Sequence, residues 1–278
     1  MELLKNIFIG MTIGVANVIP GVSGGTIALV LGIYEKLTDA VGNFIKNKEK
    51  RKEYFAFLIQ IGMGGILGIL LFSKIIDILY INYSEPMSFF FLGLIMATIP
   101  YIIKTGKEMA MTKKKIFFLV LGFVIVLALI LSNGEISTNN IVENSIILTK
   151  NYVFKLFLCG ILAAGAMIIP GVSGSFLLML MGEYYNVIGF VNRREILPII
   201  IIGSGAIIGL LLFAKWINIL MNKYHSITMY FIIGLVLAST IEIYPGISFK
   251  GIFPIIDLVL CGLGFYTAYI MGEIKNKK

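Results

Sequence analysis

Charged residues are scarce in this chain of 278 residues. They make up 14% of it, whereas an ordinary soluble domain has about 25%. Hydrophobic residues make up 58%, and the mean hydropathy is +0.96. This composition excludes a soluble globular enzyme and a disordered chain, because neither class combines so many apolar residues with so few charges. We therefore expect an integral membrane protein of the all-α class.

Cysteine and histidine are also rare. The two cysteines, Cys159 and Cys261, lie in separate apolar runs, so the chain lacks the cysteine spacing of a disulfide scaffold or a zinc site. The single histidine, His225, lies in a polar connector, which argues against a histidine-based triad or metal centre. We expect neither a cofactor nor a metal.

Basic residues outnumber acidic ones by 23 to 15, which gives a formal net charge of +8. Such an excess suggests an anionic partner. Nucleic acid is a poor candidate, because a nucleic-acid-binding face carries its basic residues on a water-facing surface, and an apolar chain has little of that surface.

An internal repeat is the strongest pattern in the chain. Four blocks recur in the same order at offsets of 140 to 150 residues, which favours a duplication over the chance likeness of apolar helices. We expect a first repeat over residues 1–135 and a second over 150–278. The paired blocks are 19–25 with 169–175, 61–79 with 202–220, 91–97 with 232–238, and LVLG at 119–122 with VLCG at 259–262.

Each repeat has three apolar stretches near the length of about 20 residues that spans a bilayer. The segments around the paired IPGVSG motifs differ, because proline and glycine interrupt the apolar run and leave half-length helices. We expect a re-entrant helical hairpin in each repeat. The predicted spans lie near residues 55–80, 87–103, 116–132, 196–220, 227–245 and 252–271, and the predicted hairpins cover 3–45 and 153–192.

The basic residues indicate an orientation for this layout. Fifteen of them fall on one face of the predicted membrane domain and four on the other, so the positive-inside rule places both termini in the cytoplasm. With three spans in each repeat, the second repeat is inverted relative to the first. If each hairpin were instead two transmembrane helices, the same residues would lie on each side of the membrane. The charge distribution therefore does not distinguish a re-entrant hairpin from a transmembrane pair.

The two interrupted motifs are candidate anion sites. A helix that begins at such a break directs free N–H groups and a positive potential at its N-terminus, which favours phosphate or carboxylate. Serine is a good N-cap, and glycine lets a ligand approach the backbone. A tight helix crossing that needs small residues is the alternative. The candidate residues are Ser23, Gly24, Gly25 and Thr26 in the first motif and Ser173, Gly174 and Ser175 in the second.

Three other polar residues lie within apolar segments. Lys74 and Lys215 are equivalent in the repeat and follow LLF in each half. They either attract phosphate, one on each side of the membrane, or extend from the helix ends to the interface. Asn17 interrupts an apolar half-helix and is expected to hydrogen-bond the break or the ligand.

Intramembrane carboxylates are few. Glu35 and Glu183 follow the two half-helices at positions that are not equivalent, and Glu242 lies near the end of a span. An ionisable residue at such depth suggests proton coupling. Helix capping or solvation at the interface explains these three glutamates equally well.

The motifs carry a resemblance to a known family. ANVIPGVSGGTIALVLGIYEKL at 16–37 and AMIIPGVSGSFLLMLMGEYY at 166–185 resemble the PopT-type polyprenyl-phosphate transporters, a bacterial membrane family formerly known as a domain of unknown function. The resemblance implies translocation of undecaprenyl phosphate across the cytoplasmic membrane, from the outer to the inner leaflet, for reuse in cell-wall synthesis. The family commonly has an aspartate where this chain has Asn17, so a mechanism that needs a charge or a proton there is in doubt.

The compact dianionic head of such a lipid suits two opposed helix N-termini, while its isoprenoid tail can stay in the bilayer. We expect alternating exposure of a phosphate site at the membrane midplane. One alternative is an integral polyprenyl-pyrophosphate phosphatase, but such enzymes use arginine and paired glutamates, whereas Gly24 and Gly174 follow the serines here. The other alternative is a transporter of a small soluble anion.

Overall fold

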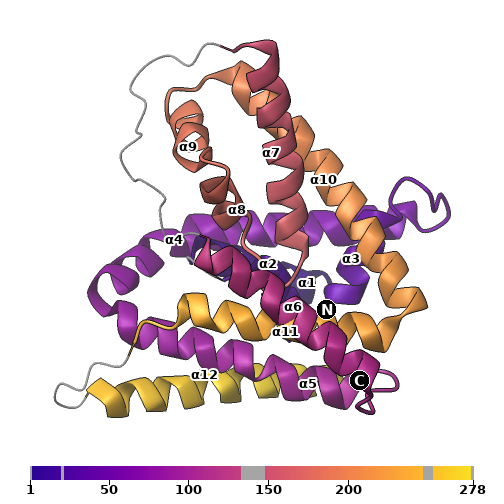
Figure 1. Cartoon of the computed structure of the whole chain (residues 1–278), viewed down its shortest axis with the longest axis vertical. Coiled ribbons are helices and arrows are strands. Elements are labelled where there is room, and N and C mark those ends of the chain that lie inside the picture. The colour runs from indigo at the N-terminus through magenta and orange to yellow at the C-terminus, as the bar shows by residue number, and fades with distance from the viewer. Residues whose placement is uncertain (1, 20–21, 133–147, 247–252, 277–278) are drawn as a thin grey trace.

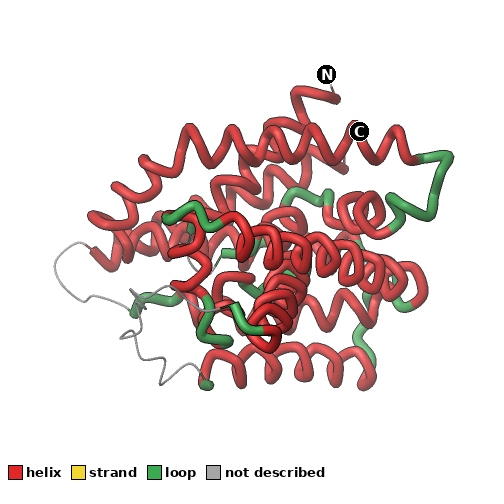
Figure 2. Tube along the Cα trace, turned by 90° about the horizontal axis from the view of Figure 1, so that it is seen from above, coloured by secondary structure: helices red, strands yellow, loops and turns green. Residues whose placement is uncertain are grey.

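The computed structural model describes residues 2–19, 22–132, 148–246 and 253–276, and the regular elements within these ranges are helices (Figures 1 and 2). Pro20 and Gly21, where the sequence predicts the first break, lie outside the described residues. The helices are α1 (Glu2–Val18), α2 (Gly24–Val30), α3 (Tyr34–Gly42), α4 (Arg51–Met96), α5 (Thr98–Thr105), α6 (Lys113–Leu131), α7 (Lys150–Ile168), α8 (Gly174–Leu180), α9 (Tyr184–Asn192), α10 (Ile196–Lys223), α11 (His225–Ile243) and α12 (Phe253–Asn276).

Seven stretches of the described helices are long and apolar enough to cross a membrane. Six of them correspond to the six predicted spans, and the expectation of an all-α, multi-pass membrane protein is confirmed. Helix α4 supplies two of these stretches, and its backbone leaves the helical region within the second one, at Tyr83 near Pro86. We call them the first arm of α4 (Arg51–Ile76) and the second arm (Ile78–Lys104), which continues through α5.

The seventh stretch is α7, which falls inside the predicted second hairpin. The expectation of a half-length helix there is wrong, because α7 has 19 residues and measures about 28 Å at 1.5 Å per residue. This length approaches the thickness of the hydrocarbon core, about 30 Å. Proline and glycine end this helix but do not shorten it to half a span.

Each break is followed by two short helices instead of the single one that the sequence predicts. Helices α2 and α3 follow the first break, and α8 and α9 follow the second, with a bend of 109° between α8 and α9. Gly32 (φ 64°) and Gly182 (φ 71°) separate the short helices. Both adopt the left-handed conformation, which only glycine adopts readily, and they lie 150 positions apart.

Helices pack in equivalent pairs at glycine contacts. Helix α1 packs on the first arm of α4, where a Cβ atom at Gly10 would meet the Ile61 carbonyl oxygen at 2.2 Å. Helix α7 packs on α10 in the same way, where a Cβ atom at Gly160 would meet the Ile202 carbonyl oxygen at 2.2 Å. These contacts join segments that the repeat makes equivalent.

Two further helix pairs join the halves of the chain. The second arm of α4 packs on α12, with Gly93 against the Cys261 carbonyl, and α11 packs on α6, with Gly234 against the Leu119 carbonyl. Gly93 and Gly234 occupy equivalent places in these contacts and lie 141 positions apart in the sequence. Their partners Leu119 and Cys261 lie 142 positions apart. The predicted pairing of LVLG at 119–122 with VLCG at 259–262 is therefore wrong by two residues, because apolar helices resemble one another at several registers.

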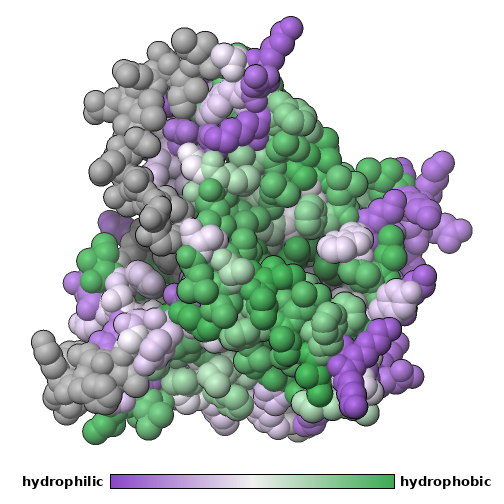
Figure 3. All heavy atoms as spheres, in the orientation of Figure 1, coloured by the Kyte–Doolittle hydropathy of each residue, from purple (hydrophilic) through white to green (hydrophobic). Residues whose placement is uncertain are grey.

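The outer surface of the helices is apolar, with large exposed side chains such as Leu70, Ile81 and Leu258. Figure 3 shows hydrophobic residues across the middle of one face and hydrophilic residues at its right edge and top. The start of α1 and the end of α12 lie close together in both views (Figures 1 and 2). In contrast, all seven residues of α2 are buried, so the segment after the first break forms the centre of the protein.

One difference between the two halves is the packing of the second short helix after each break. Helix α3 packs against α10, where a Cβ atom at Gly42 would lie 2.6 Å from the Lys215 Cα atom. Helix α9 is the counterpart of α3, yet in the described part of the chain no comparable contact joins α9 to α4. The helix arrangement is therefore asymmetric.

Candidate functional site: two glycine–serine turns in contact

The two interrupted motifs meet inside the protein. We call residues 23–26 the first turn and residues 171–175 the second turn. The Gly171 N–H donates a hydrogen bond to Thr26 Oγ1 at 2.9 Å, and the Tyr34 hydroxyl donates to the Ile168 carbonyl at 3.0 Å. A Cβ atom at Gly25 would lie 3.0 Å from the Ile168 carbonyl oxygen. Motifs that are 150 residues apart in the sequence thus lie in direct contact.

The N–H groups of Gly24 and Gly25 in the first turn donate to acceptors within the protein. Ser23 is the N-cap of α2, and its Oγ accepts from the Gly25 N–H at 3.2 Å. Asn17 Oδ1 accepts from the Gly24 N–H at 3.0 Å. These bonds confirm the predicted cap and the predicted contact of Asn17 with the break. Ser23 and Thr26 are buried, whereas Asn17 is exposed.

The second turn is more open. Ser173 is the N-cap of α8, as predicted, and its Oγ accepts from the Phe176 N–H at 3.4 Å. The Ser173 and Ser175 hydroxyl oxygens lie 2.7 Å apart. Ser173 is half-buried and Ser175 is exposed. No described residue accepts a hydrogen bond from the Gly174 N–H.

A difference in sequence explains why the turns differ. Gly24 is covered by the Asn17 amide, at 2.7 Å from a Cβ atom built on the glycine, and Gly174 is covered by the Met167 side chain at 2.8 Å. Asn17 and Met167 are equivalent in the repeat. Methionine is at most a weak acceptor, so the Gly174 N–H lacks the partner that Asn17 provides to Gly24.

The lysines predicted to attract phosphate do not contact the turns. Lys74 on α4 and Lys215 on α10 are both exposed, and no described hydrogen bond or ion pair connects either of them to a turn residue. The backbone of Lys215 instead contacts Gly42 of α3.

Glu183 is buried and forms an ionic cluster between α7 and the start of α9. Its carboxylate accepts from Lys155 Nζ at 2.6 Å, from the Tyr152 hydroxyl at 2.7 Å and from Asn186 Nδ2 at 2.9 Å. A buried carboxylate needs such partners, because the loss of water would otherwise be costly. The sequence alone did not identify Tyr152 or Lys155 as its partners. Glu242, on α11, is half-buried, and no described residue hydrogen-bonds its side chain.

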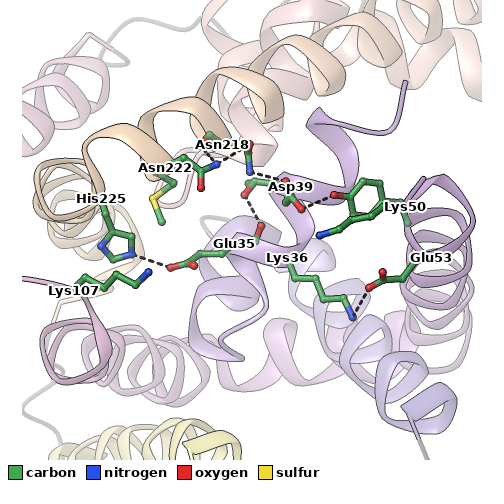
Figure 4. A pocket seen from close by; sticks show the side chains of 12 residues that line it. Glu35, Lys36, Asp39, Lys50, Glu53, Lys107, Asn218, Asn222 and His225 are labelled. Carbon is green, nitrogen blue, oxygen red and sulfur yellow. Dashed lines mark hydrogen bonds and ion pairs between the residues drawn. The ribbon is translucent and has the colours of Figure 1, made fainter. Parts of the chain in front are cut away.

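Glu35 belongs to a polar cavity of about 480 Å³, formed by α3, the start of α4, the α10–α11 junction and Lys107 (Figure 4). Glu35 Oε1 lies 3.0 Å from His225 Nε2. Asp39 accepts from the Tyr54 hydroxyl at 2.7 Å and from Asn218 Nδ2 at 3.2 Å. Sequence reasoning missed this cavity, although the spacing of Glu35 and Asp39 places both on one helix face.

Comparison with known proteins adds a family to this geometry. The model of the VCA0040-like, undecaprenyl phosphate translocase-like family matches residues 13–252. A polyprenyl-phosphate transporter of Staphylococcus aureus is 30% identical over 97% of this chain and 96% of its own length. A polyprenyl-phosphate transporter of Vibrio cholerae is 29% identical over 88% of this chain and 79% of its own. No solved structure matches the chain.

Proposed function

The chain belongs to the undecaprenyl phosphate translocase-like family, and from that premise we propose that it returns undecaprenyl phosphate across the bacterial cytoplasmic membrane for reuse in cell-wall synthesis. The names of the family and of both relatives indicate a transporter rather than an enzyme, which argues against the phosphatase alternative. The excess of basic residues on one face supports a cytoplasmic location of both termini.

The headgroup site in this proposal lies where the two turns touch. The contact between Thr26 and Gly171 is the observation that carries it, because it brings both motifs to one place inside the protein. Next to it, the second turn has the Ser173 and Ser175 hydroxyls, and the buried Gly174 N–H beside Met167 has no acceptor among the described residues. A phosphate monoester has several acceptor oxygens, and hydrogen bonds to a charged acceptor are stronger than those between neutral groups.

The second turn is therefore the main phosphate contact in this proposal. The first turn has already used the N–H groups of Gly24 and Gly25, and it contributes the exposed amide of Asn17. The sequence suggests two equivalent helix N-termini as the phosphate site, whereas this assignment gives most of the site to the second turn.

Movement of the headgroup across the membrane requires a second arrangement. In the described arrangement α3 rests on α10, where Asn43 Nδ2 donates to Asn218 Oδ1 at 3.0 Å. We propose that α9 approaches α4 in the other arrangement while α3 leaves α10, with the two inverted repeats exchanging roles. Such exchange between two packed states is a common mechanism of alternating access.

The test of the headgroup site is the double variant Ser173→Ala with Ser175→Ala. Loss of two hydroxyl contacts to a charged phosphate, each worth about 1.5–3 kcal/mol, should slow translocation of undecaprenyl phosphate in liposomes at least tenfold. Ser204→Ala is the matched control, because Ser204 is exposed on α10 and bonds the Ile201 carbonyl of its own helix. Equal rates in the double variant and the control would show that the site lies elsewhere. The parallel variant Ser23→Ala should affect folding more than substrate binding, because Ser23 caps a buried helix.

A further inference from the structure

A second cavity, of about 740 Å³, lies between α1, both arms of α4, and α12. Its volume is within the range of ligand sites, about 300–1,000 Å³. Its lining is almost wholly apolar, and two of its few polar side chains are already hydrogen-bonded. Thr12 Oγ1 donates to the Phe8 carbonyl at 3.1 Å, and Thr267 Oγ1 donates to the Leu263 carbonyl at 2.7 Å. The cavity therefore suits a hydrocarbon.

The cavity borders residues that adjoin the first turn. Ala16 and Ile27 both line it. Ala16 precedes Asn17, which bonds Gly24, and Ile27 follows Thr26, which bonds Gly171. The cavity also reaches Tyr83 at the kink of α4, and Ile256 and Met271 on α12. A molecule with its head at the turns thus finds an apolar wall directly next to that head.

We propose that this cavity binds the isoprenoid chain of the lipid phosphate during transport, so that the protein recognises the tail as well as the head. This inference rests on the proposed function. A polyprenyl phosphate carries its hydrocarbon directly on the phosphate ester. A phospholipid has a glycerol and two ester carbonyls at that place, and the apolar wall formed by Ala16 and Ile27 would leave those carbonyls without donors, which is costly.

The tail site has a direct consequence for selectivity. If the protein contacted only the head, prenyl phosphates of any length would bind alike at equal mole fraction in the bilayer. A tail in the cavity adds apolar contacts that grow with the number of isoprene units inside it. The protein should therefore bind undecaprenyl phosphate at least about tenfold more tightly than geranyl phosphate.

The experiment uses the full chain in lipid nanodiscs, with radiolabelled undecaprenyl phosphate displaced by unlabelled undecaprenyl phosphate, geranyl phosphate or phosphatidic acid. Leu260→Trp fills the cavity from α12, and Leu258→Trp is the matched control, because Leu258 lies on the same helix and is exposed to lipid. We expect Leu260→Trp to lower the affinity for undecaprenyl phosphate about tenfold while geranyl phosphate binds as before. Leu258→Trp should behave as the natural chain does.

The possible outcomes separate the two proposals. If the natural chain binds no prenyl phosphate, the proposed function fails and the tail site fails with it. If it binds undecaprenyl phosphate but Leu260→Trp keeps the full length preference, only the tail site is overturned. Displacement by phosphatidic acid as effective as that by undecaprenyl phosphate also overturns the tail site, because the cavity then holds ordinary lipid.

A second measurement does not depend on a variant that folds. Undecaprenyl phosphate with a diazirine in its isoprenoid chain is photolysed on the natural chain, and the labelled peptides are identified by mass spectrometry. We expect label at Leu94 and Ile256, which face the cavity from α4 and α12. Label confined to lipid-exposed residues such as Leu70 and Leu258 would refute the tail site.

Discussion

The hydrogen bond between the two turns can be removed with a single isosteric change, Thr26→Val. Thr26 is 1% exposed, and its Oγ1 accepts the Gly171 N–H at 2.9 Å. Valine keeps the volume of threonine but cannot accept a hydrogen bond. Gly171 is itself buried, so its N–H would be left inside the protein without water or an acceptor.

The magnitude follows from that buried donor. Leaving a buried N–H unsatisfied costs its desolvation free energy, about 1–3 kcal/mol. The cavity term that accompanies most core substitutions is small here, because the two side chains have nearly the same shape. We therefore expect Thr26→Val to lower the free energy of unfolding by about 1–3 kcal/mol. Thr26→Ser, which keeps the acceptor and loses one methyl group, should cost about 1 kcal/mol.

The assay is reversible unfolding in mixed micelles as the fraction of denaturing detergent rises, followed by liposome translocation on Thr26→Val and Thr26→Ser. Thr267→Val is the control, because the Thr267 hydroxyl is exposed and bonds only its own helix. Its effect should stay within about 0.5 kcal/mol. If Thr26→Val and Thr267→Val destabilise the protein equally, the bond does not hold the turns together, and the headgroup site loses its main support.

Three further predictions concern packing, movement and the open turn. Gly64→Ala should destabilise the protein by about 1–3 kcal/mol, because the added Cβ atom would meet a backbone oxygen of α1 at 2.1 Å. Gly62→Ala is the control in the same unfolding assay and should be neutral, because a Cβ atom at Gly62 has open space around it. A disulfide between cysteines at Asn43 and Asn218 should stop translocation until a reductant is added, and unchanged transport by the cross-linked protein would contradict movement of α3. Met167→Asn should give the free N–H of the second turn an acceptor and weaken undecaprenyl phosphate binding several-fold in nanodiscs, whereas Met167→Leu should bind normally.

The spans could be predicted because their signal is local. A run of about 20 apolar residues must cross a bilayer as a helix whatever surrounds it, and six of the seven candidate spans were found in this way. The short helices after each break could not be resolved from apolar content, because Gly32 and Gly182 act through their left-handed backbone conformation. The sequence shows a glycine at each place but not its φ angle.

The hydrogen bonds within each turn could be predicted from the sequence, because they too depend on residues close together in the chain. Each serine cap and the bond from Asn17 to Gly24 join residues at most seven apart, so a local pattern is enough to suggest them. The polar cavity brings Glu35 to His225, which lie 190 residues apart, and no local pattern links the two. The sequence makes Lys74 and Lys215 equivalent, but equivalence places neither side chain near a turn.

The two turns have nearly the same sequence, yet a fully symmetric exchange between them is not expected, because two positions at the turns differ. Thr26 in the first repeat corresponds to Phe176 in the second, and Asn17 corresponds to Met167. Threonine and asparagine supply the acceptors that close the first turn, and phenylalanine and methionine cannot supply them in a mirrored arrangement. The first turn therefore stays satisfied by the protein itself and serves as a fixed centre, while the second turn keeps donors for a ligand. In the proposed mechanism, exchange between the repeats moves α3 and α9 around a headgroup site that belongs mainly to the second repeat.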